Sequence, residues 1–121
     1  MKKLNIFIVD DEENTCKAIS RILSIEKHKV SYEINPKIAL SQIQNNKKVD
    51  LLITDIQMPE VNGIEIIEEL RKLKPNLPII AISAHFNKDI LDSLSDSYRI
   101  EFIEKPFGGL ELLQHVDKYV F

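Results

Sequence analysis

The most informative segment for the fold is Asp50-Leu51-Leu52-Ile53-Thr54-Asp55-Ile56-Gln57-Met58-Pro59, an apolar run that leads into an acid and a turn. Short runs that are apolar nearly throughout are typical of strands buried on both faces, as in parallel sheets covered by helices. Two other runs share this character, Asn5–Val9 and Pro78–Ile82. The sequence therefore predicts three interior strands of a parallel sheet.

Two further strands are predicted at the edges of this sheet. In Val30–Ile34 and Ile100–Ile103 polar residues alternate with apolar ones, which is typical of strands with one solvated face. Between the five runs, apolar residues recur at helical spacing, namely at Cys16, Ile19, Ile22 and Leu23; at Ala39, Leu40 and Ile43; at Ile64, Ile67 and Leu70; and at Leu110, Leu113 and Val116. Right-handed crossovers with the first strand at the centre then predict an α/β fold, a doubly wound five-stranded parallel sheet in the order 2-1-3-4-5 with helices on both faces.

Several residues mark the expected helix ends. Asn62 and Asn87 are predicted N-caps, and Pro36 and Pro75 stand where a helix begins or has just ended. A further helix is expected around residues 89–97, but its serines favour turns. We expect that helix to be short or frayed.

Composition limits the class of protein. The chain has 121 residues, with 16 Lys and Arg against 19 Asp and Glu, and a net charge of −3. This predicts a single domain over residues 1–121, with no basic surface for direct binding of nucleic acid. Its apolar runs are too short to cross a membrane. Because Cys16 is the only cysteine, nothing requires an oxidising compartment, and we expect a cytoplasmic protein.

Acidic residues follow two of the predicted interior strands. Asp10 and Asp11 come after the first run, and Asp55 ends the third. The carboxyl ends of parallel strands meet at one edge of the sheet, and three carboxylates gathered there repel one another unless a cation binds. Oxygen ligands without His or Cys favour Mg²⁺, for which Mn²⁺ can substitute. In isolation, Asp55 would be interpreted as a turn residue.

A hydroxyl and an ammonium are predicted at the same edge. Ser83 ends the fourth run, and Lys105 follows the fifth. Each would be interpreted alone as an ordinary surface or strand-end residue. Together with a carboxylate nucleophile and a divalent ion they form a site for phosphoryl transfer, in which Asp55 is the natural nucleophile.

These motifs, taken in order, resemble the receiver domain of the response-regulator family of two-component signalling, which has the flavodoxin-like fold. The likeness covers nearly the whole chain. The matching segments are Ile8-Val9-Asp10-Asp11-Glu12; Asp50 to Pro59 with Asn62-Gly63; Ile79-Ile80-Ala81-Ile82-Ser83-Ala84; and Lys105-Pro106-Phe107.

The resemblance implies roles for the residues at this edge. Asp55 would accept the phosphoryl group, Ser83 and Lys105 would bind its oxygens, and the Lys105–Pro106 bond would be cis. The metal ion would be held by Asp10, Asp11, Asp55 and the backbone carbonyl of Gln57. Phe102 matches the family's switch aromatic, although burial of its ring in the core would also explain it.

The resemblance also implies partners. The phosphoryl donor would be a sensor histidine kinase or a histidine phosphotransfer protein, and the receiver would control a downstream protein or a fused output domain. The surface formed by the helix expected around residues 89–97, the strand Ile100–Ile103 and the last predicted helix would change on phosphorylation, in a monomer or a phosphorylation-dependent dimer. The chain would undergo phosphoryl transfer to itself and slow autodephosphorylation, without acting as a turnover enzyme.

Some positions depart from the family pattern. Tyr98-Arg99 stands where most members have Gly-Ala, and Gly108-Gly109 replaces the usual Asp or Ser cap of the last helix. Gln57 and His85 occupy positions where members tune access of water to the acyl phosphate. The three histidines share no ligand spacing, which favours surface positions for them, and Cys16 is expected in the core.

Two rival functions make different demands on the same residues. A degenerate receiver that acts only through protein contacts would not need the set formed by Asp10, Asp11, Asp55, Ser83 and Lys105. A phosphatase with an aspartyl nucleophile would need a second acid two residues after Asp55, where this chain has Gln57. The residues therefore favour a phosphoacceptor switch, with the degenerate receiver as the alternative.

Overall fold

A computed structural model of the chain describes residues 3–45, 48–58, 61–86, 88–94 and 99–120. Five parallel strands form one sheet in the order β2-β1-β3-β6-β7. Their bounds are β1 Asn5–Val9, β2 Lys29–Glu33, β3 Leu51–Asp55, β6 Ile79–Ser83 and β7 Ile100–Glu104. The predicted order is confirmed, and the numbers differ only because a separate antiparallel hairpin, β4 (Gln57–Met58) with β5 (Val61–Asn62), was not predicted.

The predicted division into interior and edge strands is also confirmed. β1, β3 and β6 each pair with two neighbours, whereas β2 and β7 each pair with one. Every residue of β3 and β6 is buried. These two strands begin one residue later than the predicted runs, and they end at Asp55 and Ser83, as expected.

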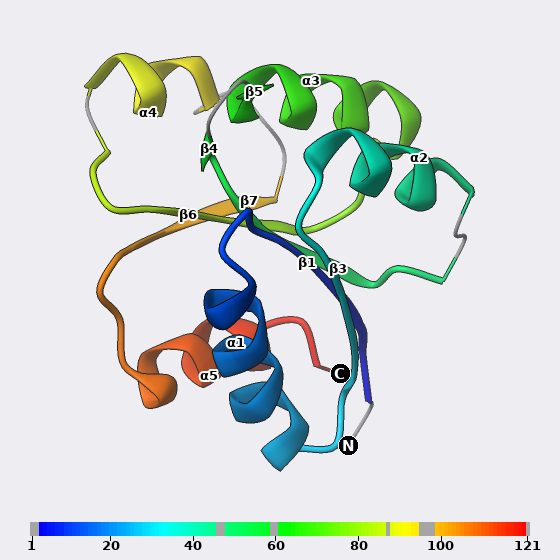
Figure 1. Ribbon diagram of the computed structural model, residues 1–121, viewed down its shortest axis with the longest axis vertical. Helices are drawn as coiled ribbons and strands as arrows, with labels where there is room; N and C mark the ends of the chain where they lie inside the picture. The colour runs from blue at the N-terminus through cyan, green and yellow to red at the C-terminus, as the bar shows by residue number, and fades with distance from the viewer. Residues whose placement is uncertain (1–2, 46–47, 59–60, 87, 95–98, 121) are drawn as a thin grey trace.

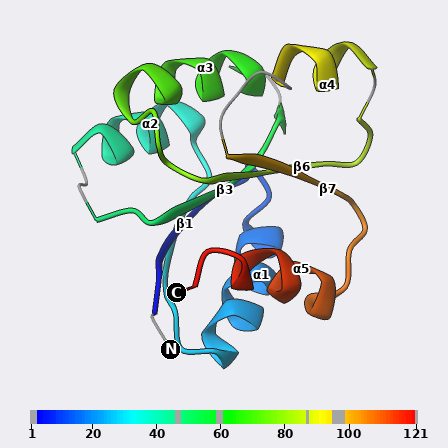
Figure 2. The same ribbon diagram turned by 180° about the vertical axis from the view of Figure 1, so that it is seen from behind.

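Two layers of helices cover the sheet, as Figure 1 shows and Figure 2 confirms from behind. α1 (Glu13–Ile25) and α5 (Gly109–Asp117) lie on one face, and α2 (Pro36–Asn45), α3 (Gly63–Leu73) and α4 (Lys88–Leu94) lie on the other. Successive strand residues point to opposite faces, so each layer has its own apolar core. No helix in the described part of the chain is long and apolar enough to cross a membrane.

The helix ends agree with the local signals that could be compared. The Asn62 carboxamide oxygen accepts a hydrogen bond of 2.9 Å from the Ile64 N–H, which is the predicted cap of α3. α2 begins at Pro36, and the described part of α4 spans Lys88–Leu94. Gly108 precedes α5 without a side-chain cap. The predicted cap Asn87, the end of the expected helix at 95–97, and Tyr98 lie outside the described residues.

Gly63 allows α3 to begin close to the chain that follows β3. A Cβ atom added at this position would lie 2.5 Å from Ile56 Cα and 2.7 Å from its carbonyl oxygen, which no side chain could tolerate without a backbone shift. The first turn of α3 is therefore packed directly on the residue after Asp55, which fixes the path of the chain at the carboxyl edge of the sheet.

One expectation about histidines is wrong, and the expectation about Cys16 is confirmed. His28 is buried, with its Nδ1 atom accepting a 3.0 Å hydrogen bond from the Leu4 N–H. Burial lowers the pKa of this imidazole, because the charged form would lose its hydration. His28 thus connects the turn between α1 and β2 to the chain just before β1 through a buried hydrogen bond, whereas His85 is exposed. Cys16 is buried against the sheet in the core beneath α1.

Candidate functional site

The predicted acids meet at the carboxyl edge of the sheet, where β1 and β3 lie side by side. Asp10 follows β1 and Asp55 ends β3, and both are buried, whereas Asp11 is exposed. One carboxylate oxygen from each of the three residues lies within 4.8 Å of the others. We call this set the acidic cluster. Its members come together because the parallel register places Val9 opposite Thr54, one residue before each buried acid.

The Lys105 side chain enters this cluster from the loop after β7. Its Nζ atom lies 3.1 Å from Asp10 Oδ2 and 3.0 Å from Asp55 Oδ2. The loop is held in place by the Lys105 N–H, which donates a 2.8 Å hydrogen bond to the Ser83 carbonyl. Burial alone would lower the pKa of Lys105, but its hydrogen bonds to the two carboxylates outweigh burial and raise it. The group is therefore a fixed ammonium shared by two acids.

The second oxygen of each buried acid binds a backbone amide. The Glu12 N–H donates to Asp10 Oδ1 at 2.9 Å, and the Gln57 N–H donates to Asp55 Oδ1 at 2.8 Å. Even so, burial raises the pKa of Asp10, since desolvation outweighs the Glu12 and Lys105 hydrogen bonds and the Asp55 charge adds to it. The cluster holds more negative charge than its single ammonium compensates.

This surplus suits a hard divalent cation. The three carboxylates supply oxygen donors only, which is the set that Mg²⁺ prefers. The nearby Cys16 thiol donates to the Asp10 carbonyl, with 3.4 Å between the sulfur and oxygen atoms. Burial raises the pKa of this thiol to about 11, so it stays protonated and does not compete as a thiolate ligand. The residues present thus fit Mg²⁺.

Ser83 lies at the same edge of the sheet, but its hydroxyl forms hydrogen bonds with His85 and not with the acids. Ser83 Oγ donates to the His85 carbonyl at 2.9 Å and accepts from the His85 N–H at 3.1 Å. The His85 carbonyl accepts a second hydrogen bond, of 3.2 Å, from Gln57 Nε2. The Lys105–Pro106 bond is cis, as the resemblance implied.

Phe102 lies in β7 outside the acidic cluster and is partly exposed. Its ring packs on the core beneath α3 and α4, and the ring of Phe86 meets it edge to face, with centroids 5.3 Å apart and planes at 79°. Sequence reasoning missed Phe86. The available signal was an aromatic three residues after Ser83, in the loop that leaves the strand paired with β7.

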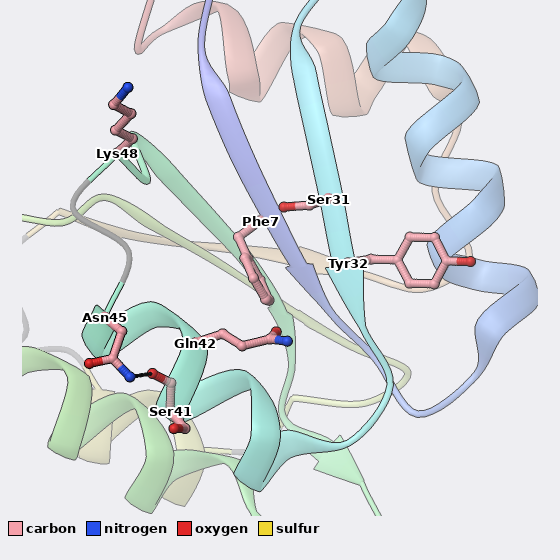
Figure 3. Close-up of a pocket in the computed structure, with 7 residues that line it drawn as sticks. All are labelled: Phe7, Ser31, Tyr32, Ser41, Gln42, Asn45 and Lys48. Atoms are coloured by element: carbon pink, nitrogen blue, oxygen red, sulfur yellow. Dashed lines mark hydrogen bonds between the residues drawn. The ribbon is translucent and has the colours of Figure 1, made fainter.

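The hollow at the β2 edge of the sheet lacks this chemistry. Figure 3 shows this hollow of about 750 Å³ beside α2, where Phe7 and Gln42 face one another. The Tyr32 ring points away from them toward α1, and the Asn45 amide donates to the Ser41 carbonyl of its own helix. None of the residues that line this hollow is an acid or a histidine. The acidic cluster therefore remains the candidate site.

Comparison with known proteins shows a family match over most of the chain. The family model of the response regulator receiver domain matches residues 6–117. The response regulator SaeR of Staphylococcus aureus is 30% identical over 114 residues, which is 93% of this chain and 49% of SaeR. The two-component response regulator ARR21 of Arabidopsis thaliana is 34% identical over 111 residues, 91% of this chain and 18% of that protein. The chain thus spans half or less of these relatives.

Solved structures agree in fold. A CheY-like receiver domain protein from Methanospirillum hungatei superposes with a TM-score of 0.90 at 24% identity, over 97% of this chain and 93% of that one. The chemotaxis protein CheY4 of Vibrio cholerae gives a TM-score of 0.88 at 20% identity, over 98% and 100%. On the family match and the shared fold, the chain belongs to the response regulator receiver domain family.

Proposed function

We propose that this chain is a phosphoacceptor switch in which Asp55 receives a phosphoryl group from a phosphohistidine. The observation that carries the proposal is the Lys105 ammonium, shared at 3.1 and 3.0 Å between Asp10 and Asp55 inside a cluster of three acids. A carboxylate nucleophile and a fixed cation are then adjacent in a largely buried site, where electrostatic stabilisation of transferred charge is strongest.

In the proposed step, a carboxylate oxygen of Asp55 forms a bond to phosphorus while the phosphorus–nitrogen bond of the donor breaks. The electron pair of that bond returns to the donor imidazole. Lys105 offsets negative charge on the phosphoryl oxygens, and it needs no movement to reach Asp55. Mg²⁺, for which Mn²⁺ can substitute, would be held by Asp10, Asp11, Asp55 and the Gln57 carbonyl, and it supplies further charge neutralisation when bound.

The switch follows from the added charge. A phosphoryl group on Asp55 attracts the Ser83 hydroxyl, which in the resting structure donates to the His85 carbonyl. Movement of this loop would free space for the Phe102 ring and alter the surface formed by α4, β7 and α5. That surface would control a downstream protein or a fused output domain. The chain itself would show only slow autodephosphorylation and no turnover of an external substrate.

The donor is proposed to be a protein, a sensor histidine kinase or a histidine phosphotransfer protein. A hollow of about 450 Å³ borders Lys105, between α1 and the loop before α5, and Ile22 and Phe107 give it an apolar lining. Apolar surface beside a charged site supports docking of a protein donor. We further propose a single cytoplasmic domain over residues 1–121, without direct binding of nucleic acid or membrane, as a monomer or a phosphorylation-dependent dimer.

Intact mass after incubation with acetyl phosphate or phosphoramidate tests the proposal. In Mg²⁺ the wild type should gain the mass of one phosphoryl group, and Asp55→Asn should gain none. Asp117→Asn, an exposed acid on α5, is the matched control and should behave like wild type. If the wild type gains no mass with either donor, the alternative, a degenerate receiver that acts through protein contacts, takes the place of the switch.

A further inference from the structure

The His85 carbonyl connects the hairpin after β3 with the residue that ends β6. It accepts hydrogen bonds from Ser83 Oγ at 2.9 Å and from Gln57 Nε2 at 3.2 Å. Gln57 belongs to the hairpin after β3, and His85 to the loop between β6 and α4. The Gln57 backbone N–H also binds Asp55 Oδ1 at 2.8 Å. One residue therefore contacts both the acceptor and the loop that carries Ser83.

The residue after His85 extends this connection to β7. The Phe86 ring meets the Phe102 ring edge to face, with centroids 5.3 Å apart. Both rings pack on the core beneath α3 and α4. Any displacement of the His85 backbone must carry Phe86 with it, because the two residues are adjacent in the chain. The Gln57 carboxamide is thus linked to Phe102 through consecutive contacts that are all present in the resting structure.

We propose that the Gln57 carboxamide is a latch that holds the loop from Ser83 to Phe86 in its resting position and so keeps Phe86 against Phe102. We call this contact the Gln57 latch. The inference deepens the proposed function, on which it rests, by naming the side chain that opposes switching. Gln57 is then a positioning residue, since its carboxamide acts through His85 and Phe86 rather than on the transferred group.

The physical argument concerns which state the hydrogen bond favours. To bind a phosphoryl oxygen on Asp55, the Ser83 hydroxyl must leave the His85 carbonyl, which then keeps only the Gln57 donor. As long as that donor stays in place, the loop keeps its position and Phe86 continues to occupy the space beside Phe102. The Gln57 latch therefore stabilises the resting state over the switched one, and a contact made in only one state shifts the equilibrium toward that state.

The size of the effect follows from the kind of bond. Gln57 and His85 are both exposed, and a neutral hydrogen bond between such groups favours the resting state by about three- to tenfold. Loss of the donor should raise the population of the switched state by that factor. A ligand that binds only the switched state should then bind more tightly by the same factor.

Gln57→Met tests the latch, because methionine keeps the length of the side chain and removes its donor. Gln57→Asn is a second test, since it keeps the amide on a shorter side chain that does not reach His85. Gln42→Met, at an exposed position on α2 beside the hollow of Figure 3, is the matched control. The ligand is beryllofluoride, a phosphoryl analogue that forms no hydrolysable bond, so the measurement is independent of access of water to an acyl phosphate.

Two measurements are needed. The first is the dissociation constant of beryllofluoride in Mg²⁺, which should fall about three- to tenfold in both Gln57 variants and stay at the wild-type value in Gln42→Met. The second uses metal-free protein labelled with para-fluorophenylalanine, with resonances assigned through Phe86→Leu and Phe102→Leu. In both Gln57 variants the Phe86 and Phe102 fluorine resonances should move toward their positions in beryllofluoride-saturated wild type.

The outcomes separate the latch from the proposed function. Wild-type affinity together with unmoved Phe86 and Phe102 resonances in Gln57→Met would overturn the latch. Tighter binding without movement of the Phe102 resonance would also overturn it, because Gln57 would then act on the acceptor directly. If wild type binds no beryllofluoride and gains no phosphoryl mass, the proposed function fails. The latch is then still tested, since the metal-free resonances of Phe86 and Phe102 must move in Gln57→Met.

Discussion

Two charged clusters lie near opposite ends of β7, and they are built in opposite ways. After the strand, the acidic cluster brings three carboxylates to one ammonium, that of Lys105. Near its start, the single carboxylate of Glu101 accepts hydrogen bonds from three donors on and after α5, namely His115, Lys118 and Tyr119. The first cluster has three carboxylates for one ammonium, whereas the second has three donors for one carboxylate.

The pKa values follow this difference. Burial raises the pKa of Asp10 despite its hydrogen bonds. Burial also acts to raise the pKa of Glu101, but its hydrogen bonds to Lys118, Tyr119 and His115 outweigh burial and lower it. Burial and the Glu101 hydrogen bond together raise the pKa of the Tyr119 hydroxyl, so it stays a donor. The charge of Glu101 is already balanced by its three donors, whereas the acidic cluster is stabilised further by any cation that binds it.

The largest expected effect is the loss of the ammonium. Lys105→Met should lower the free energy of unfolding by about 2–4 kcal/mol without divalent ions, because two buried carboxylates lose their shared partner. Mg²⁺ should restore part of this loss. Lys118→Met should cost about 1 kcal/mol or less, since the Lys118 side chain is more than half exposed and Glu101 keeps two donors. Urea unfolding measures both, and equal losses would remove the contrast between the clusters.

The next effect is an opposite dependence of stability on pH. The pKa of Asp10 is higher in the folded protein than its ordinary value of 3.8. Its contribution to the free energy of unfolding is therefore complete below pH 3.8, and it is lost as pH rises through the raised pKa. The pKa of Glu101 is lowered, so its contribution is complete above the ordinary value of 4.5 and is lost as pH falls through its pKa in the folded protein.

Neutral substitutions should therefore differ in sign in metal-free buffer. Asp10→Asn should be more stable than wild type at neutral pH, with the difference shrinking on acidification. Glu101→Gln should be less stable than wild type by about 1–2 kcal/mol at neutral pH, again converging in acid. Chemical denaturation across this pH range is the measurement. A loss of stability for Asp10→Asn at neutral pH would show that the Lys105 contact outweighs burial.

A smaller effect is expected from the exposed member of the acidic cluster. Asp11→Asn should leave metal-free stability within about 0.5 kcal/mol of wild type, because this side chain is exposed. It should weaken Mg²⁺ binding about tenfold, which removes about 1.4 kcal/mol of the stabilisation by saturating Mg²⁺. Thermal unfolding with and without Mg²⁺ separates the two quantities. Unchanged stabilisation by Mg²⁺ would place the ion away from Asp11.

The smallest effect is expected from removing one donor in the Glu101 cluster. Tyr119→Phe removes one of the three donors to Glu101 but keeps the aromatic ring, whose centroid lies 5.6 Å from the Cζ atom of the Arg99 guanidinium. We expect a loss of about 0.5–1 kcal/mol, with no change in Mg²⁺ binding. Urea unfolding and Mg²⁺ titration of the variant test this. A change in Mg²⁺ affinity would mean that the two ends of β7 are coupled.

Much of the site could be predicted from local sequence. An apolar strand followed at once by an acid occurs at Val9-Asp10 and Thr54-Asp55, and parallel packing brings such ends together. The burial of His28 could not be predicted this way, because its imidazole accepts a hydrogen bond from the Leu4 N–H, which lies 24 positions away in the chain. The hairpin of β4 and β5 was missed as well, since two-residue strands carry no measurable periodicity.

Local sequence patterns were enough to predict the strands, their interior or edge positions, and the residue types at the carboxyl edge of the sheet. These depend on hydrophobic periodicity and on residues that are neighbours in the chain. The folded structure was needed to find that Lys105 binds Asp10 from 95 positions away, that Gln57 and Ser83 share the His85 carbonyl, and that Glu101 has three donors. Such contacts join different elements, and side-chain packing between those elements selects them, so no local pattern encodes them.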